Sequence, residues 1–157
     1  MRVLTPNEFG QVRPGGVLAI GNFDGVHAGH QEILNTARQL AADRRAGLTL
    51  MTFEPHPAVI LHPDTAPKIL TPLDWKLRLL GRFADACVVV LEDNRELLRL
   101  DAEAFVDQFL MPAIRPSVMV EGVDFRFGAD RRGTVETLTG LGRTRGFDVK
   151  VVPSRQI

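Results

Sequence analysis

The feature that most constrains the fold is a glycine-rich turn placed between an apolar run and an amphipathic one. The turn spans Gly21–His30, the apolar run Val17–Ile20 precedes it, and a helical pattern reaching Leu40 follows. This order indicates a strand, a tight turn and a helix. Glycines let the backbone bend sharply and let a ligand approach where a Cβ would collide. The new helix points unpaired N–H groups and its positive dipole end into the turn, so the segment predicts a phosphate site.

Two histidines in this turn give the predicted site its chemistry. His27 and His30 are three residues apart, a spacing that places both imidazoles on one face of the first helical turn. The interpretation we favour is that they donate together to phosphoryl oxygens. Two alternatives stay open: both are surface histidines at a helix start, or they ligate zinc with His56 and His62.

Short β-branched runs alternate with helical patterns along the chain, which is typical of βαβ units around a parallel sheet. The pattern predicts an α/β, Rossmann-like fold with an open parallel sheet of about five strands and helices on both faces. Its strands are expected at Val17–Gly21, Leu48–Phe53, Cys87–Leu91, Ser117–Glu121 and Val149–Val152. Its helices are expected at His30–Arg44, Leu73–Phe83, Ala102–Leu110 and Thr134–Arg145.

Single residues mark the expected ends of these helices. Thr71 is predicted to cap the second helix, with Pro72 at its first helical position. Gly47 and Gly146 stand where C-terminal caps belong.

Two segments that follow predicted strands are expected at the carboxyl edge of the sheet, where open α/β folds bind ligands. Glu54–Ile69 carries four prolines, too many for a regular element. The motif Thr52–Pro57, which closes the second predicted strand, forms a flat apolar wall for a planar ring, or an ordinary loop with Phe53 in the core. Asp124–Gly133 combines aromatic rings with arginines that suit a heterocycle and phosphate, or it is a solvated arginine turn.

Composition excludes several classes of partner. The 157 residues fit one domain, and 19 basic residues balance 19 acidic ones, so no nucleic acid or anionic membrane surface is expected as a partner. The chain begins without an apolar signal core, and no apolar run approaches bilayer length. The single cysteine, Cys87, permits no disulfide framework. We therefore expect a cytoplasmic protein.

Three motifs, taken together, resemble the bacterial FAD synthetases of the nucleotidylyltransferase superfamily. They are Ala-Ile-Gly-Asn-Phe-Asp-Gly-Val-His-Ala-Gly-His at 19–30, Thr-Phe-Glu-Pro-His-Pro at 52–57 and Gly-Val-Asp-Phe-Arg-Phe-Gly at 122–128. The resemblance runs from about Val17 to about Phe147. The His-x-Gly-His element alone indicates only the superfamily, and the other two motifs make the match specific.

The resemblance implies a set of site residues. The catalytic pair would be His27 and His30, which contact the ATP phosphates. ATP would be bound by Gly21, Asn22, Phe23, Asp24 and Gly29. FMN would be bound by Thr52, Phe53, Pro55, Pro57, Asp124, Phe125, Phe127, Gly128 and Arg132. No metal-ligating residue is assigned, because Mg²⁺ would arrive with ATP and be held mainly by its phosphates.

The resemblance also implies a domain organisation, and this sequence departs from the family's pattern in two ways. Residues 1–157 form one FMN adenylyltransferase domain without the riboflavin kinase domain that usually follows, so a missing kinase domain or protein is an expected partner. The family's domain continues into a serine-serine-x-x-isoleucine-arginine segment, whereas Ser154 and Arg155 follow the last strand too closely to match it. We therefore expect a chain that lacks its C-terminal segment.

The implied reaction joins FMN and ATP to give FAD and pyrophosphate. Another phosphate-bearing acceptor, such as pantetheine phosphate or nicotinate mononucleotide, is the enzymatic alternative. A non-catalytic flavin- or nucleotide-binding module is the alternative from another class of protein.

Overall fold

The computed structural model describes residues 2–66, 68, 72–82, 87–92 and 95–153. These residues form a parallel sheet of six strands in the order β1-β4-β3-β2-β5-β6. The strands are β1 Arg2–Leu4, β2 Val17–Ile20, β3 Leu48–Phe53, β4 Cys87–Leu91, β5 Val118–Gly122 and β6 Asp148–Val152. The predicted α/β fold is confirmed, whereas the expected five strands are six. β1 escaped prediction because it has three residues at the sheet edge, and only Leu4 is buried.

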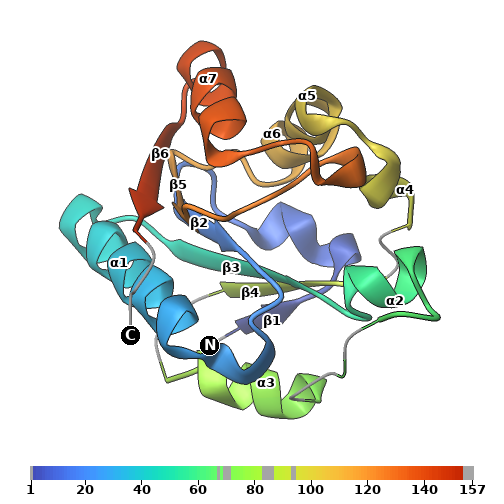
Figure 1. Cartoon of the computed structure of the whole chain (residues 1–157). Coiled ribbons are helices and arrows are strands. Elements are labelled where there is room, and N and C mark those ends of the chain that lie inside the picture. Colours follow the sequence, from blue (N-terminus) through green and yellow to red (C-terminus); the bar gives the residue numbers. More distant parts are fainter. Residues whose placement is uncertain (1, 67, 69–71, 83–86, 93–94, 154–157) are drawn as a thin grey trace.

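Helices cover both faces of the sheet, as predicted (Figure 1). The α-helices are α1 Ala28–Arg44, α2 Pro57–Leu61, α3 Leu73–Leu80, α4 Arg95–Arg99, α5 Ala102–Ala104, α6 Met111–Ala113 and α7 Val135–Arg145. Short 3₁₀ turns are η1 Pro6–Gln11, η2 Asp24–Val26 and η4 Ala129–Arg131, and a π-helical segment, η3 Phe105–Leu110, joins α5 to α6.

The core forms two layers because successive strand residues point to opposite faces. Val17 and Ala19 of β2 pack in the layer under α1 and α3. Leu18 and Ile20 pack in the opposite layer, which also contains buried residues of η3 and α7. Burial on both faces explains why the strands read as continuous apolar runs.

Strand β2 lies at the point where the chain reverses its direction across the sheet. From β2 the chain proceeds to β3 and β4 on one side, and later returns to place β5 on the other side of β2. The carboxyl ends of strands at such a switch point flank a crevice where ligands bind in open α/β folds. The glycine-rich turn follows β2, so the fold positions it at this crevice.

Some predicted details were wrong. The segment rich in prolines contains α2, because Pro57 occupies the first helical turn, where a missing N–H costs nothing. Pro72 is the residue before α3, not its first residue, and Thr71 lies outside the described residues, as does Phe83. Arg45, with φ +52°, caps α1 in place of Gly47. Gly146, with φ +85°, caps α7 as predicted.

The predicted helix 102–110 is longer and less regular than expected, since it runs through α5, η3 and α6. Ser154 and Arg155 lie outside the described residues. Within the described ranges, no helix is both long and apolar enough to cross a membrane.

Candidate active site

The turn after β2 is folded around the ring of Phe23. This residue has a left-handed backbone, with φ +51°, and its side chain is only 1% exposed. A Cβ on Gly21 would lie 2.9 Å from Phe23 Cε1, so the glycine makes room for the ring. Gly25 adopts φ +74°, which also favours glycine. Phe23 thus packs inside the turn that is predicted to bind ATP.

His27 and His30 meet as the spacing predicts. Their rings stack with centroids 3.6 Å apart and an interplanar angle of 22°. His27 is the N-cap of α1, and its Nδ1 accepts the backbone N–H of Gly29 at 3.2 Å. Because Nδ1 is the acceptor, a neutral His27 ring carries its proton on Nε2. A Cβ on Gly29 would lie 3.1 Å from His27 Cε1, so this glycine makes room for the catalytic candidate.

His30 is less exposed than a surface residue at a helix start. Its ring meets Phe23 edge to face, with centroids 5.6 Å apart. Burial and, to a smaller extent, the neighbouring His27 lower the pKa of His30 to about 4, although Asp24 opposes both effects. His30 is therefore neutral at pH 7 and can interact with an anion only as an N–H donor.

The neutral state of His30 makes folding sensitive to acid. Between pH 6.5 and pH 4 the unfolded chain binds a proton that the folded chain does not, so stability falls as pH falls through this window. We expect a slope below about 1.4 kcal/mol per pH unit, because solvent reaches part of the ring. Urea unfolding from below pH 4 to above pH 6.5 measures it.

The variant His30→Gln should lose this component, and the exposed His62→Gln is the matched control. Equal slopes in the wild type and in His30→Gln would contradict the assignment.

Two buried polar atoms at this turn lack a hydrogen-bond partner among the described residues. They are Asn22 Oδ1 and His30 Nδ1. Buried polar groups are nearly always paired with protein, water or a ligand. Their position beside the stacked histidines therefore supports a polar ligand at the carboxyl end of β2.

The predicted FMN side after β3 divides into buried and accessible residues. Thr52 is fully buried, and its hydroxyl donates to the Asn22 carbonyl oxygen at 3.1 Å. Phe53, Pro55 and Pro57 are partly exposed. His56 caps α2, with its Nδ1 accepting the Ala58 N–H at 3.0 Å. Phe53 and the two prolines thus remain available as a wall, whereas Thr52 joins this side to the turn after β2.

The loop after β5 is a compact turn. Phe127 is buried, and its backbone pairs with Gly133 in an isolated bridge with hydrogen bonds of 2.9 and 3.1 Å. The half-buried Phe125 stacks on Phe127 with centroids 5.6 Å apart. Asp124 and Arg132 are exposed. Gly128 has φ +78° and lies close to Ala102, where a Cβ would be 2.8 Å from the backbone nitrogen.

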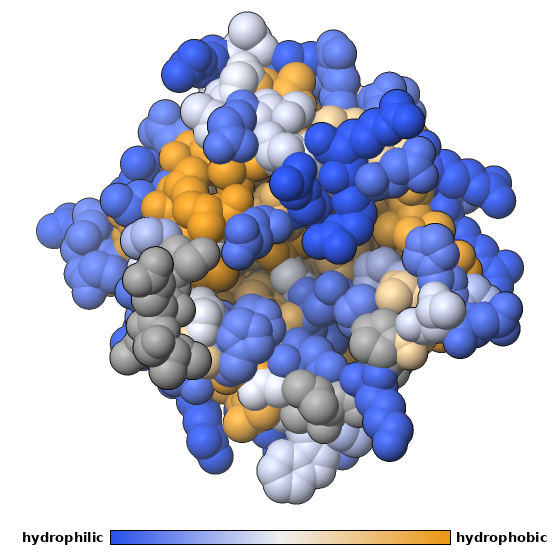
Figure 2. Space-filling view, in the orientation of Figure 1, coloured by the Kyte–Doolittle hydropathy of each residue, from blue (hydrophilic) through white to orange (hydrophobic). Residues whose placement is uncertain are grey.

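The three loops converge at one end of the sheet. The pKa of His56 is lowered, chiefly by burial; Asp24 opposes this shift, and Lys76 and Arg131 add to it, so charges from the turn after β2 and from η4 both reach His56. Figure 2 shows a hollow near the middle of this face, between the places where Figure 1 shows α2 and the start of α1. The turn after β2, the start of α2 and η4 therefore lie near one another at this end of the sheet.

Two buried ionisable side chains at this edge were missed. Lys76 of α3 is 6% exposed, and Glu121 of β5 is 1% exposed. Both left a signal: Lys76 stands on the apolar stripe of its helix with Leu73, Leu77 and Leu80, and Glu121 ends an apolar strand run. A charge at a core position indicates a specific partner.

No group of three His, Cys, Asp or Glu side chains that could hold a metal ion occurs in the part of the chain that the structure describes. His27, His30, His56 and His62 all lie in that part, so they do not form the zinc site that was left open.

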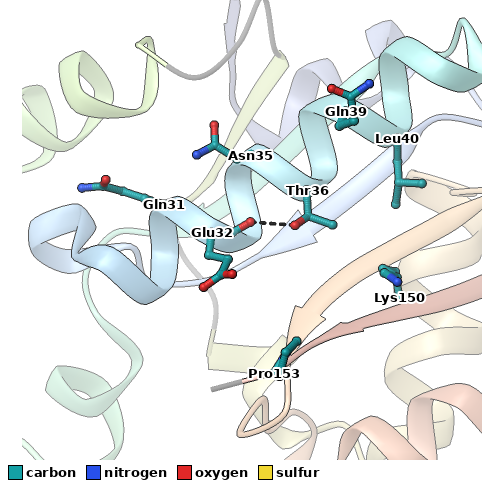
Figure 3. A pocket seen from close by; sticks show the side chains of 8 residues that line it. All are labelled: Gln31, Glu32, Asn35, Thr36, Gln39, Leu40, Lys150 and Pro153. Atoms are coloured by element: carbon teal, nitrogen blue, oxygen red, sulfur yellow. Dashed lines mark hydrogen bonds between the residues drawn. The ribbon is translucent and has the colours of Figure 1, made fainter. Parts of the chain in front are cut away.

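An open groove of about 720 Å³ lies between α1 and β6. Figure 3 shows Gln31, Glu32 and Asn35 of α1 along one side, with Lys150 and Pro153 across from them. None of its lining residues was predicted to belong to the site.

The fold and the site together define a class. A parallel sheet with a histidine pair at the first helix after the switch-point strand is the arrangement of a nucleotidylyltransferase-like domain. The sequence model of the FAD synthetase family matches residues 10–157, and the chain belongs to this family.

Curated relatives agree with this family. The chain is 36% identical over 123 residues to a bifunctional riboflavin kinase/FMN adenylyltransferase from Bacillus subtilis, covering 78% of this chain and 39% of the relative. It is 38% identical over 135 residues to the enzyme of the same name from Escherichia coli, covering 86% and 43%. The chain thus spans about two fifths of the length of these relatives.

Solved structures show the same fold. A macrolide-efflux protein from Streptococcus pneumoniae superposes with a TM-score of 0.83 at 24% identity, over 100% of this chain and 51% of that one. A pantoate-beta-alanine ligase from Francisella tularensis gives 0.65 at 12% identity, over 100% and 68%.

Proposed function

We propose that this chain is an FMN adenylyltransferase, which transfers AMP from ATP to FMN and releases pyrophosphate. The observation that carries the proposal is the stacked pair His27 and His30 at the start of α1, beside the unpartnered Asn22 Oδ1. Membership of the FAD synthetase family supports the choice of FMN over another acceptor.

The reaction needs alignment and charge stabilisation more than proton transfer. The second pKa of a phosphate monoester is about 6, so the FMN phosphate is largely dianionic at pH 7. One of its oxygens attacks the α-phosphorus of ATP, the bond to the bridging oxygen breaks, and pyrophosphate leaves with the electron pair. No general base is required, and catalysis depends on positioning and electrostatics.

The histidines suit this requirement as hydrogen-bond donors. His27 holds its proton on Nε2 because Nδ1 accepts from Gly29. The N-terminus of α1 adds a positive dipole at the same point. We assign both imidazoles and this helix end to the charge that develops at the α-phosphorus.

Mg²⁺ is proposed to enter with ATP. The ATP phosphates would hold most of its coordination sphere. Asp24 is the carboxylate whose charge acts on three groups of the site, because it opposes the lowering of the pKa of His30, His56 and Lys76. When bound, the ion would neutralise phosphate charge.

The relatives' names pair this activity with a riboflavin kinase. We propose that a kinase domain or protein supplies FMN to this chain. A cytoplasmic location stays a prediction from the sequence.

Separate titrations distinguish the proposal from its alternatives. FMN and ATP are titrated alone by calorimetry, and pyrophosphate is then followed with FMN, pantetheine phosphate or nicotinate mononucleotide as acceptor. We expect release with FMN and ATP together. Release with another acceptor only indicates a different nucleotidylyltransferase, and binding without any release indicates a non-catalytic module.

Phe125→Ala tests the flavin side of the crevice. The half-buried Phe125 ring stacks on Phe127 and offers its other face to a planar ring. Loss of one aromatic contact of 0.5–1.5 kcal/mol should weaken FMN binding by up to about tenfold and leave ATP binding unchanged. Calorimetry measures both constants. Trp75→Ala, which removes an aromatic ring that is 54% exposed on α3, is the control. Equal losses for both ligands would show that the loop is only structural.

A further inference from the structure

Lys76 joins the two sides of the crevice. From α3 its ammonium donates to the Asn22 carbonyl oxygen at 2.9 Å, to Thr52 Oγ1 at 3.0 Å and to the Phe53 carbonyl oxygen at 3.4 Å. An ammonium has three protons, so these bonds use its whole capacity. Asn22 belongs to the turn predicted to bind ATP, and Thr52 and Phe53 belong to the strand end predicted to border FMN.

The hydrogen-bonded link that Lys76 makes is buried, and none of the three residues that accept its hydrogen bonds is exposed. Lys76 is 6% exposed, and Thr52 is fully buried. Burial lowers the pKa of Lys76, while Glu54 and Asp24 raise it. A buried charge is costly unless it is fully hydrogen-bonded, so the position demands a lysine whose three acceptors stay in place. The two loops are consequently held at a fixed separation.

We infer that Lys76 is a positioning residue that sets the ATP side of the crevice against the FMN side. The inference rests on the proposed function, because it assigns a consequence for adenylyl transfer. Each side retains its own ligand contacts without Lys76, but the attacking phosphate and the α-phosphorus lose their alignment. A misplacement of about 1 Å costs up to 10²-fold in rate.

Lys76→Met keeps the apolar stem and removes the ammonium. We expect kcat per folded protein to fall at least about tenfold, with the separate dissociation constants of ATP and FMN changed less than about threefold. Arg78→Met, which removes an exposed cation from the same helix, should leave both unchanged. If Lys76→Met does not fold, Lys76→Gln, which retains two amide donors, is judged by the same criteria.

Amide hydrogen exchange separates this inference from the proposed function. Lys76→Met should speed exchange in both 21–23 and 51–54, and Arg78→Met in neither. If the wild type forms no FAD but this exchange pattern appears, the proposed function fails and the link stands. If the wild type forms FAD and Lys76→Met keeps wild-type kcat and exchange, or loses affinity at unchanged kcat, the inference is overturned.

Discussion

We expect the replacement of His27 or His30 by alanine to lower the proposed rate of FAD formation by about 100-fold, which is the cost of removing one preorganised donor from developing charge. Both imidazoles lie stacked at the start of α1, and His27 is exposed there. The affinity for ATP should change much less, because the helix N-terminus and Asn22 remain. Single-turnover kinetics with saturating FMN and ATP measures the chemical step directly.

The same experiment needs a control for the loss of an imidazole. His62→Ala removes an exposed histidine just after α2 and should retain the wild-type rate. His30→Ala also removes an edge-to-face contact with Phe23, so its melting temperature is measured in parallel. A variant that melts earlier but keeps the specific activity of its folded fraction would contradict the catalytic assignment of that histidine.

Glu121→Ala should destabilise the fold by on the order of 3 kcal/mol, since it leaves a buried donor unpaired and opens a cavity. Glu121 Oε1 accepts the Ile20 N–H at 2.8 Å and thereby joins β5 to the carboxyl end of β2. Chemical denaturation measures the loss. Glu103→Ala, which removes an exposed carboxylate bonded to Arg145, is the control and should cost less than about 1 kcal/mol.

Glu121→Gln should gain stability relative to the wild type as pH rises above 4.5. Burial raises the pKa of Glu121 well above 4.5, and the Ile20 hydrogen bond opposes this only in part. Above pH 4.5 the unfolded chain has released a proton that the folded chain retains, so wild-type stability falls with rising pH by up to about 1.4 kcal/mol per unit. The glutamine keeps the acceptor and removes this loss. A wild type that gains stability over Glu121→Gln as pH rises above 4.5 would contradict the assignment.

The parts of the fold that follow local patterns were predictable from the sequence. β3 and β4 match their predicted bounds, because strands covered on both faces read as unbroken apolar runs. The edge strand β1 and the short helix α2 could not be predicted from such apolar runs. β1 has little to bury, and the prolines around α2 conceal that one of them stands at a helix start.

The candidate site also has one part that local sequence patterns predict and another part that they do not. The histidine pair is set by spacing within one helical turn, so its stacking follows from the sequence. Burial of Phe23, Thr52 and Phe127 depends on which side of a loop meets the core, and residue type does not fix that side. The contacts of Lys76 join segments 24 and 54 residues apart, which no local pattern reveals.

The most direct test of the proposed reaction follows the α-phosphorus of ATP. The purified chain is incubated with FMN, Mg²⁺ and ATP labelled at the α-phosphorus, and then with ATP labelled at the γ-phosphorus. We predict that the α-label appears in FAD and the γ-label in pyrophosphate, in equal amounts. No α-label in FAD, or γ-label released as free phosphate without pyrophosphate, would contradict adenylyl transfer by this site.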